Sequence, residues 1–157
     1  AGQQALNTKY SKKLIKDFNS LGSNTKYLGF ISNTEVKEIL LKSSILVVPS
    51  IWQEPFALTA LEGICSGSAV IASKVGGMKE MLEGLGMLID DIDEIKLKES
   101  IQTLLQNKKL LTEYQNRSWQ NYQYNQTDIV KKQDAIRKKI FKNFNFNLNK
   151  KIKSKLE

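Results

Sequence analysis

The sequence predicts an α/β domain in which a parallel sheet is covered by helices. Short apolar runs rich in β-branched residues alternate along the chain with longer segments whose apolar residues recur at helical spacing. Glycine, proline and serine signals separate these segments. Such alternation is typical of parallel strands joined by crossover helices.

Four short runs are expected to form the strands of this sheet. The clearest is Ile-Leu-Val-Val at 45–48, which is apolar and mostly β-branched and which Pro49 and Ser50 bring to an end. The other three runs share this apolar character. The predicted strands are 25–31, 45–48, 69–72 and 87–89.

The helices are expected where apolar residues recur every three or four positions. Gly22 is a stop signal after the first of them. Ser32 and Glu35 have the spacing of a capping box. Pro55 suits the first position of a helix on which Leu58, Leu61 and Cys65 face inward. The predicted helices are 8–21, 33–43, 55–65, 78–82, 93–106 and 109–122.

Composition narrows the class of protein. The 157 residues, 41% hydrophobic and 25% charged, fit one globular domain with a sizeable core. A single cysteine excludes an internal disulfide, and the absence of histidine removes the usual zinc clusters and catalytic triads. No apolar run approaches the ~20 residues of a membrane span, so a cytoplasmic location is expected. Because the first residues resemble the interior of a fold, we expect the native start to be missing.

The basic charge is concentrated near the end of the chain. Residues 126–157 contain ten Lys or Arg and three acids, net +7 of the total +8, which leaves +1 for the rest. We therefore expect an α/β domain at 1–124, truncated at its start, a basic amphipathic helix at 125–145 and a disordered tail at 146–157. The helix has two interpretations: packing across domains, or peripheral attachment to the inner face of an anionic membrane. No nucleic-acid partner is expected, because the tail lacks a recognised binding motif.

The segment from Pro49 to Glu62 is the strongest candidate site. A helix beginning at Pro55 would place the amides of Phe56, Ala57 and Leu58 in its first turn, where unpaired donors and the helix dipole favour a diphosphate. Glu54 would stand at the mouth of this site. Glu62 would lie roughly 10–12 Å away along the helix, a span that suits a nucleotide sugar with one carboxylate near the hexose and the other near the ribose.

Three motifs together resemble a known family: Glu54-x7-Glu62 within Pro-Ser-x3-Glu-Pro-Phe-x-Leu, the run Ser66 to Ser73, and Gly76-Gly77-x2-Glu80. They are similar to the C-terminal, donor-binding half of family-4 (group 1) retaining glycosyltransferases of the GT-B fold. The resemblance covers residues 1–106 and implies a Rossmann-like sheet. Gly63 replaces the alanine that is usual in the family, which we attribute to close packing.

The resemblance implies roles for individual residues. Glu54 would be the catalytic-site residue that contacts and orients the transferred sugar, and Glu62 would bind the ribose. The backbone near Phe30 and Ile31 would contact the base, and the Gly76-Gly77 loop would face the donor. The implied donor-binding residues are Phe30, Ile31, Phe56, Ala57, Leu58, Glu62, Gly76 and Gly77.

The resemblance also implies the reaction. A hexose would pass from a UDP-, GDP- or ADP-linked sugar to an acceptor hydroxyl with retention of configuration, without a metal or other cofactor. The Asp91-Ile92-Asp93 spacing is not assigned to a metal, because Asp93 is a natural N-cap. The acceptor, a glycan such as lipopolysaccharide or a lipid-linked glycan, would bind an N-terminal domain missing here, so the fragment should not turn over alone. The alternative is a non-catalytic α/β nucleotide-binding or interaction module.

Overall fold

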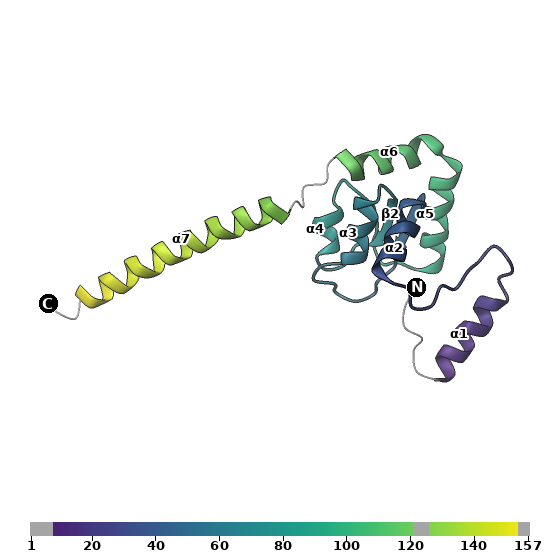
Figure 1. Ribbon diagram of the computed structural model, residues 1–157, viewed down its shortest axis with the longest axis horizontal. Coiled ribbons are helices and arrows are strands. Elements are labelled where there is room, and N and C mark those ends of the chain that lie inside the picture. Colours follow the sequence, from purple (N-terminus) through teal and green to yellow (C-terminus); the bar gives the residue numbers. More distant parts are fainter. Residues whose placement is uncertain (1–7, 121–125, 154–157) are drawn as a thin grey trace. The chain divides into compact units, whose positions relative to one another are not determined.

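The structure is a computed structural model that describes residues 8–120 and 126–153 (Figure 1). The chain divides into two units, Ala1–Gln120 and Asn121–Glu157. The first contains the sheet and its helices, and the second contains one long helix. Predictions that concern residues 1–7, 121–125 and 154–157 lie outside the described residues.

The first unit is built on three parallel strands in the order β1-β2-β3, namely β1 (Ile45–Val48), β2 (Ala69–Ser73) and β3 (Met87–Ile89). Ile45 lies beside Ala69 in the register, and Ile71 lies beside Met87. Every residue of β2 is buried, as the central strand of a covered parallel sheet requires. The predicted α/β class is therefore confirmed, and three of the four predicted strands are present.

Six helices accompany the sheet in the described part of this unit. They are α1 (Lys9–Asn19), α2 (Asn33–Leu41), α3 (Leu58–Cys65), α4 (Met78–Leu82), α5 (Glu94–Gln106) and α6 (Lys108–Gln120). Capping residues mark the starts of three of these helices. The side chains of Thr8, Ser32 and Asp93 each accept a hydrogen bond from a backbone N–H in the first turn that follows.

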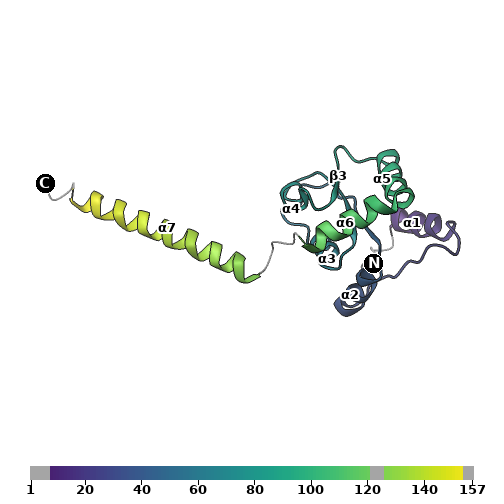
Figure 2. The ribbon, with the colours of Figure 1, turned by 90° about the horizontal axis from the view of Figure 1, so that it is seen from above.

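One face of the sheet packs against α5 and α6, which adjoin each other (Figure 2). Ile71 of β2 and Leu104 of α5 are fully buried in this core. The partly buried side chains that pack around it include Leu97, Ile101 and Leu110. This hydrophobic cluster packs β2 and β3 against α5 and α6.

Helix α3 lies against β1 and β2. Ala60 and Ile64 are fully buried on its inner side. A Cβ on Gly63 would overlap Leu46 and would come within 3.0 Å of Val70, so glycine permits the helix to approach the sheet closely. Close packing is thus the reason for glycine at this position.

Ser68 ties the start of β2 to the end of α2. Ser68 is completely buried, and its single hydroxyl hydrogen is shared between the carbonyl oxygens of Ser43 at 3.0 Å and Leu40 at 3.3 Å. These bonds satisfy carbonyls at a helix end that have no partner within the helix. They fix the direction in which the chain enters the central strand.

The predicted strand at 25–31 is wrong. The hydroxyl and N–H of Thr25 both bond back to the carbonyl of Gly22, which makes a turn where an extended run was expected. Gly29 has a φ of 63°, in the left-handed region, which interrupts the extended backbone that a strand needs. Phe30 is 81% exposed, so this apolar run does not supply a core strand.

The predicted start of α3 is also corrected. The helix begins at Leu58 and not at Pro55, because Ala57 has extended backbone (ψ 90°) and serves as the N-cap. Cys65, expected to face inward, is exposed. The buried stripe of this helix follows Ala60, Gly63 and Ile64 instead, so two small residues are closest to the sheet.

The second unit contains α7 (Gln126–Lys153). This helix overlaps the predicted amphipathic helix at 125–145 and continues through 146–153, which we expected to be disordered. The apolar positions of the sequence continue at helical spacing, with Phe144, Leu148 and Ile152 four residues apart. That periodicity, overlooked in an Asn- and Lys-rich segment, accounts for the longer helix.

Candidate functional site

The candidate site lies at the edge of the sheet where the parallel strands end. The strands β1, β2 and β3 end at Val48, Ser73 and Ile89, and the loops that follow leave from this common edge. In open α/β sheets, ligands bind beyond the carboxyl ends of the strands. The loop after β1 carries Glu54, and the loop after β2 carries Gly76 and Gly77.

Two backbone hydrogen-bond donors connect these loops. The N–H of Gly77 donates to the carbonyl oxygen of Glu54 at 2.7 Å. The N–H of Gly76 donates to the side-chain oxygen Oε1 of Gln53 at 2.9 Å. The structure thus brings Glu54 and the glycine pair together, although they are more than twenty residues apart.

The two glycines are required by this close approach. A Cβ on Gly77 would overlap the carbonyl oxygen of Pro55, and a Cβ on Gly76 would lie 2.8 Å from the backbone nitrogen of Glu54. Gly76 also has a φ of 51°, which disfavours any side chain. Their amides, expected to face the donor, are already hydrogen-bonded to the loop after β1. The glycines therefore shape the site by docking the loops.

The Glu54 side chain has one hydrogen-bond donor close to it. Its side chain is half-buried, and Oε1 accepts a hydrogen bond from the hydroxyl of Ser50 at 3.3 Å. Two carboxylate oxygens can accept about four hydrogen bonds in all, so most of this capacity remains for other donors. Ile51 and Trp52 in the same loop are 80% and 77% exposed. The carboxylate thus has one weak side-chain partner, the Ser50 hydroxyl, and is only half-buried.

The start of α3 supplies the backbone donors of the site. Its N-cap, Ala57, makes no side-chain capping bond. The first-turn amides belong to Leu58, Thr59 and Ala60, which have no partner within the helix and lie at the positive end of its dipole. Of the three predicted amides, only that of Leu58 belongs to the first turn, whereas Phe56 and Ala57 precede it. Glu62 lies further along α3 and is exposed.

Phe30 and Ile31 are not brought to this edge by strand pairing. Ile31 is half-buried and immediately precedes Ser32, the N-cap of α2. Because residues 25–31 do not form a strand, the sheet does not bring the loop after Ile31 to this edge. The contact of their backbone with a nucleotide base stays a prediction.

The Asp91-Ile92-Asp93 segment is a helix cap. The Asp93 carboxylate accepts from the N–H of Lys96 at 2.8 Å, which confirms its predicted role at the start of α5. The ammonium of Lys96 donates to the carbonyl oxygens of Asp90 and Asp91 at 3.0 and 2.9 Å. This loop is thus fixed by its own helix. Over the described ranges 8–120 and 126–153, no group of three or more acids or cysteines is placed to hold a metal ion.

A comparison of the sequence with protein families decides the class. The model of the family described as glycosyl transferases group 1 matches residues 1–122, which is most of the chain. The chain belongs to this family.

One relative of this group 1 glycosyltransferase chain is the lipopolysaccharide 1,2-N-acetylglucosaminetransferase of Salmonella typhimurium. The two are 25% identical over 133 residues, which cover 77% of this chain and 35% of the relative.

Solved glycosyltransferases have the same fold. Sucrose-phosphate synthase from Thermosynechococcus elongatus superimposes with a TM-score of 0.70 at 24% identity, covering 90% of this chain and 37% of that protein. The Anabaena protein HepE, solved in complex with UDP, gives a TM-score of 0.62 at 24% identity, covering 70% of this chain and 31% of HepE. Both share the GT-B fold, so this chain is one Rossmann-like half. It spans about a third of the length of each of these proteins.

Three residues near the candidate site have polar environments that the sequence did not predict. Ser50, quoted only as part of the motif, and Gln53 were given no role, because their partners, Glu54 and Gly76, are defined only by how the loops fold. Ser73 was quoted only as the last residue of the family run 66–73 and lay outside the predicted strand at 69–72. It is 1% exposed, and its hydroxyl is the one buried side-chain polar atom in the described part of the chain for which the structure gives no partner. A serine among alanine, valine and isoleucine was the only signal in the sequence.

Proposed function

We propose that this chain is the donor-binding half of a hexosyltransferase. The enzyme would transfer a hexose from a nucleoside-diphosphate sugar to an acceptor hydroxyl, with retention of configuration and without a bound metal. The observation that carries the proposal is the docking of the Gly76-Gly77 loop onto the backbone of Glu54. This contact fixes the backbone of Glu54, four residues before the start of α3, whose N-cap makes no side-chain hydrogen bond.

The proposed roles follow from this arrangement. Glu54, oriented by Ser50, would accept hydrogen bonds from the hexose hydroxyls and position the sugar. The first-turn amides of α3 would bind the diphosphate and stabilise the negative charge that develops as it departs. Glu62, exposed on the same helix, would accept bonds from the ribose hydroxyls. Backbone at Phe30 and Ile31 would contact the base.

The donor nucleotide is proposed to be UDP, GDP or ADP, and UDP is the first to test because the HepE structure contains it. The acceptor is proposed to be a glycan or lipid-linked glycan, a class that includes the substrate named for the Salmonella relative. It would bind a second domain, since reaction in the GT-B fold takes place between two halves. We place the reaction in the cytoplasm, and we expect no turnover by this chain alone.

The deciding experiment is an NMR titration of the chain with UDP, GDP and ADP and then with their sugars. We expect saturable shifts for one nucleotide at residues 56–62. Glu62→Ala should weaken binding about tenfold or more, because it removes charge-assisted bonds to the ribose. Glu99→Ala removes another exposed glutamate, on α5, and is the matched control.

The results of this titration test the assigned site, the absence of a metal and the role of Glu54 separately. Equal loss of affinity in both variants, or shifts confined to other residues, would show that the assigned site is wrong. Affinity that disappears with EDTA would contradict metal-free donor binding. For the full-length protein, Glu54→Gln should lower turnover by a larger factor than it lowers nucleotide affinity, because its bonds are to the sugar and not to the nucleotide.

A further inference from the structure

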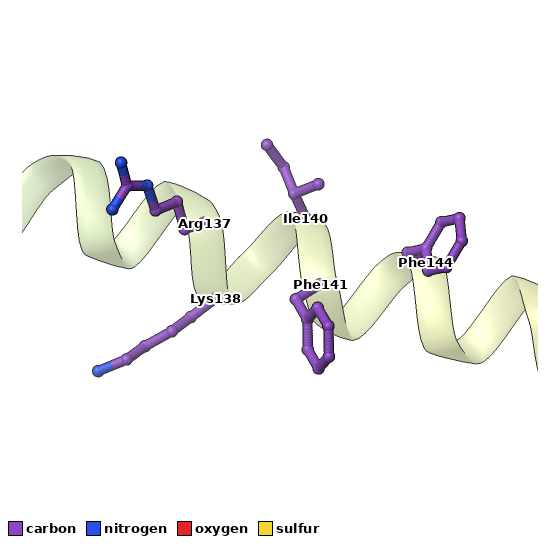
Figure 3. Close-up of a pocket in the computed structure, with 5 residues that line it drawn as sticks. All are labelled: Arg137, Lys138, Ile140, Phe141 and Phe144. Atoms are coloured by element: carbon purple, nitrogen blue, oxygen red, sulfur yellow. The ribbon is translucent and has the colours of Figure 1, made fainter.

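Helix α7 carries a continuous apolar stripe. Ile136, Ile140 and Phe144 recur every four residues and Phe141 follows Ile140, so at 100° per residue the four lie within an arc of about 140°, which also contains Arg137. Within their unit they are 58%, 62%, 67% and 63% exposed. Figure 3 shows Ile140, Phe141 and Phe144 standing out from the helix, with Arg137 and Lys138 about a turn earlier; these five side chains line a shallow hollow.

The remaining surface of α7 is strongly basic. Its sequence contains eight lysines and one arginine against two aspartates, so its net charge is +7. The two aspartates form ion pairs with Lys131 at 3.7 Å and Arg137 at 3.8 Å. At 100° per residue, Lys138, Lys139 and Lys142 lie beside and behind the apolar stripe, and all three are exposed.

We propose that α7 is a binding site for an anionic lipid bilayer, with the helix lying in the plane of the interface. Helices that bind in this way combine low overall hydrophobicity, a basic polar face and an apolar face with aromatic residues. Anionic headgroups attract the lysines, while Ile140, Phe141 and Phe144 enter the acyl boundary. Among the described helices, none is both long and apolar enough to cross a membrane.

The composition of α7 favours a bilayer over a protein partner. Protein interfaces are enriched in arginine and depleted in lysine, whereas α7 has eight lysines and one arginine. Lysine stems can lie along an apolar surface while the ammonium groups reach outward to headgroups. This suits a helix whose lysines flank its apolar stripe.

The stripe also distinguishes a bilayer from a nucleic acid. Binding to the phosphates of a nucleic-acid duplex requires cationic side chains. It does not require an apolar helix face, so it would not explain the apolar stripe of α7. A bilayer engages both sides of α7, the cations at the headgroups and the phenylalanines below them. Substituting the apolar side and the basic side of α7 separately therefore distinguishes a lipid headgroup from a nucleic acid as the source of phosphate.

The test is co-sedimentation of the 157-residue chain with vesicles of phosphatidylglycerol and phosphatidylcholine in equal parts, compared with pure phosphatidylcholine. We expect binding to the anionic vesicles that weakens as salt is raised. Phe141→Gln with Phe144→Gln should weaken it at least about tenfold. Lys138→Gln with Lys139→Gln and Lys142→Gln should do the same.

Matched controls exist in the first unit. Ile95→Gln with Leu105→Gln removes two exposed apolar side chains from α5, and Lys12→Gln with Lys37→Gln and Lys98→Gln removes three exposed lysines. These controls should change vesicle affinity less than about twofold, because their sites are not on α7. The variant with Phe141→Leu and Phe144→Leu keeps the stripe apolar, and leucine is a good helix former. It should retain vesicle binding, which separates loss of apolar contact from a change in the helix itself in the Gln variant.

The proposal is overturned by any of three results. Binding that is absent, or equal for both lipid compositions, would show that charge on the bilayer is not recognised. Loss with the lysine variants and not with Phe141→Gln and Phe144→Gln would indicate a soluble polyanion, which a parallel titration with RNA would reveal. An equal loss of vesicle affinity in the α7 variants and in their controls would show that the binding site is not on α7. None of these results bears on donor binding, so this inference is independent of the proposed reaction.

Discussion

Gly76 and Gly77 place two loops in contact because neither residue has a side chain. Gly77 has an ordinary backbone conformation, and its substitution would introduce only a clash with the carbonyl oxygen of Pro55. Gly84 presents the opposite case, with a φ of 74° and nothing within 4 Å of an added Cβ. Gly76 combines both constraints. These three positions separate steric overlap from backbone strain.

Gly77→Ala is expected to destabilise the chain by about 1–3 kcal/mol, the usual range for overpacking. Gly84→Ala should cost about 1–2 kcal/mol, the strain of a left-handed backbone, and Gly76→Ala should exceed either. Urea unfolding followed by circular dichroism measures all three. Should Gly77→Ala unfold at the wild-type midpoint, the loops are not in the contact described.

Single residues at the site were predictable where their role is local. Asp93 follows a strand and precedes a helical pattern, so its cap could be derived from neighbours in sequence. Glu54 was placed at the right edge for the same reason. The engagement of the Gly76 amide by Gln53 was not predictable, because it spans 23 positions and depends on the approach of two loops.

At the scale of elements, the start of α2 shows how a cap depends on pH. Glu35 accepts hydrogen bonds from the backbone N–H of Ser32 at 2.8 Å and from its hydroxyl at 2.7 Å. The hydrogen bond from the Ser32 side chain, followed by that from its backbone, lowers the pKa of Glu35. Protonation of the carboxylate would remove acceptors from both donors.

We predict that Ser32→Ala raises the pKa of Glu35 back toward its ordinary value. Because the folded pKa is lowered, the stabilisation from this cap is present above the unfolded pKa and is lost as pH falls through the folded one. An NMR titration of the Glu35 side chain in acid measures the shift. Ser43→Ala, at the far end of α2, is the control, and an equal rise in both variants would contradict the assignment.

The strands and helices differ in how far the sequence determined them. The three confirmed strands are apolar runs, of which β2 is buried throughout and β1 and β3 are partly buried. The run at 25–31 has strand composition, but Gly29 adopts a left-handed backbone and Phe30 faces solvent. Pro55 is compatible with a helix start, yet its carbonyl lies against Gly77, and the helix begins only after Ala57, whose backbone is extended. Tertiary contacts overrode local preference in this loop.

For the whole molecule, stability should reside in the first unit. Among the described residues, every buried side chain lies between Ser11 and Leu104. Residues 121–157 form a separate unit whose described apolar side chains are exposed within it. The described core therefore belongs to the first unit alone.

We predict that a chain ending at Gln120 keeps the stability of the whole chain to within about 0.5 kcal/mol, the range of surface changes. Thermal unfolding followed by circular dichroism compares the two, with the loss of α7 appearing as reduced helix signal at low temperature. A fall of several degrees in Tm would mean that residues 121–157 contribute to the core. Ile64→Ala in the shortened chain is the positive control, since it empties a fully buried position.

The order of the strands has a consequence for the chain in concentrated solution. β1 lies at one edge of the sheet, and no described strand pairs with its outer side. Its sequence, Ile-Leu-Val-Val, contains no charge and no proline, the features by which edge strands usually discourage a neighbour. Such an edge can template another copy of the same strand. Purified protein should therefore aggregate through pairing of β1 edges. A lysine in place of Leu46 or Ile45 should raise the solubility and should lower the stability by weakening the packing.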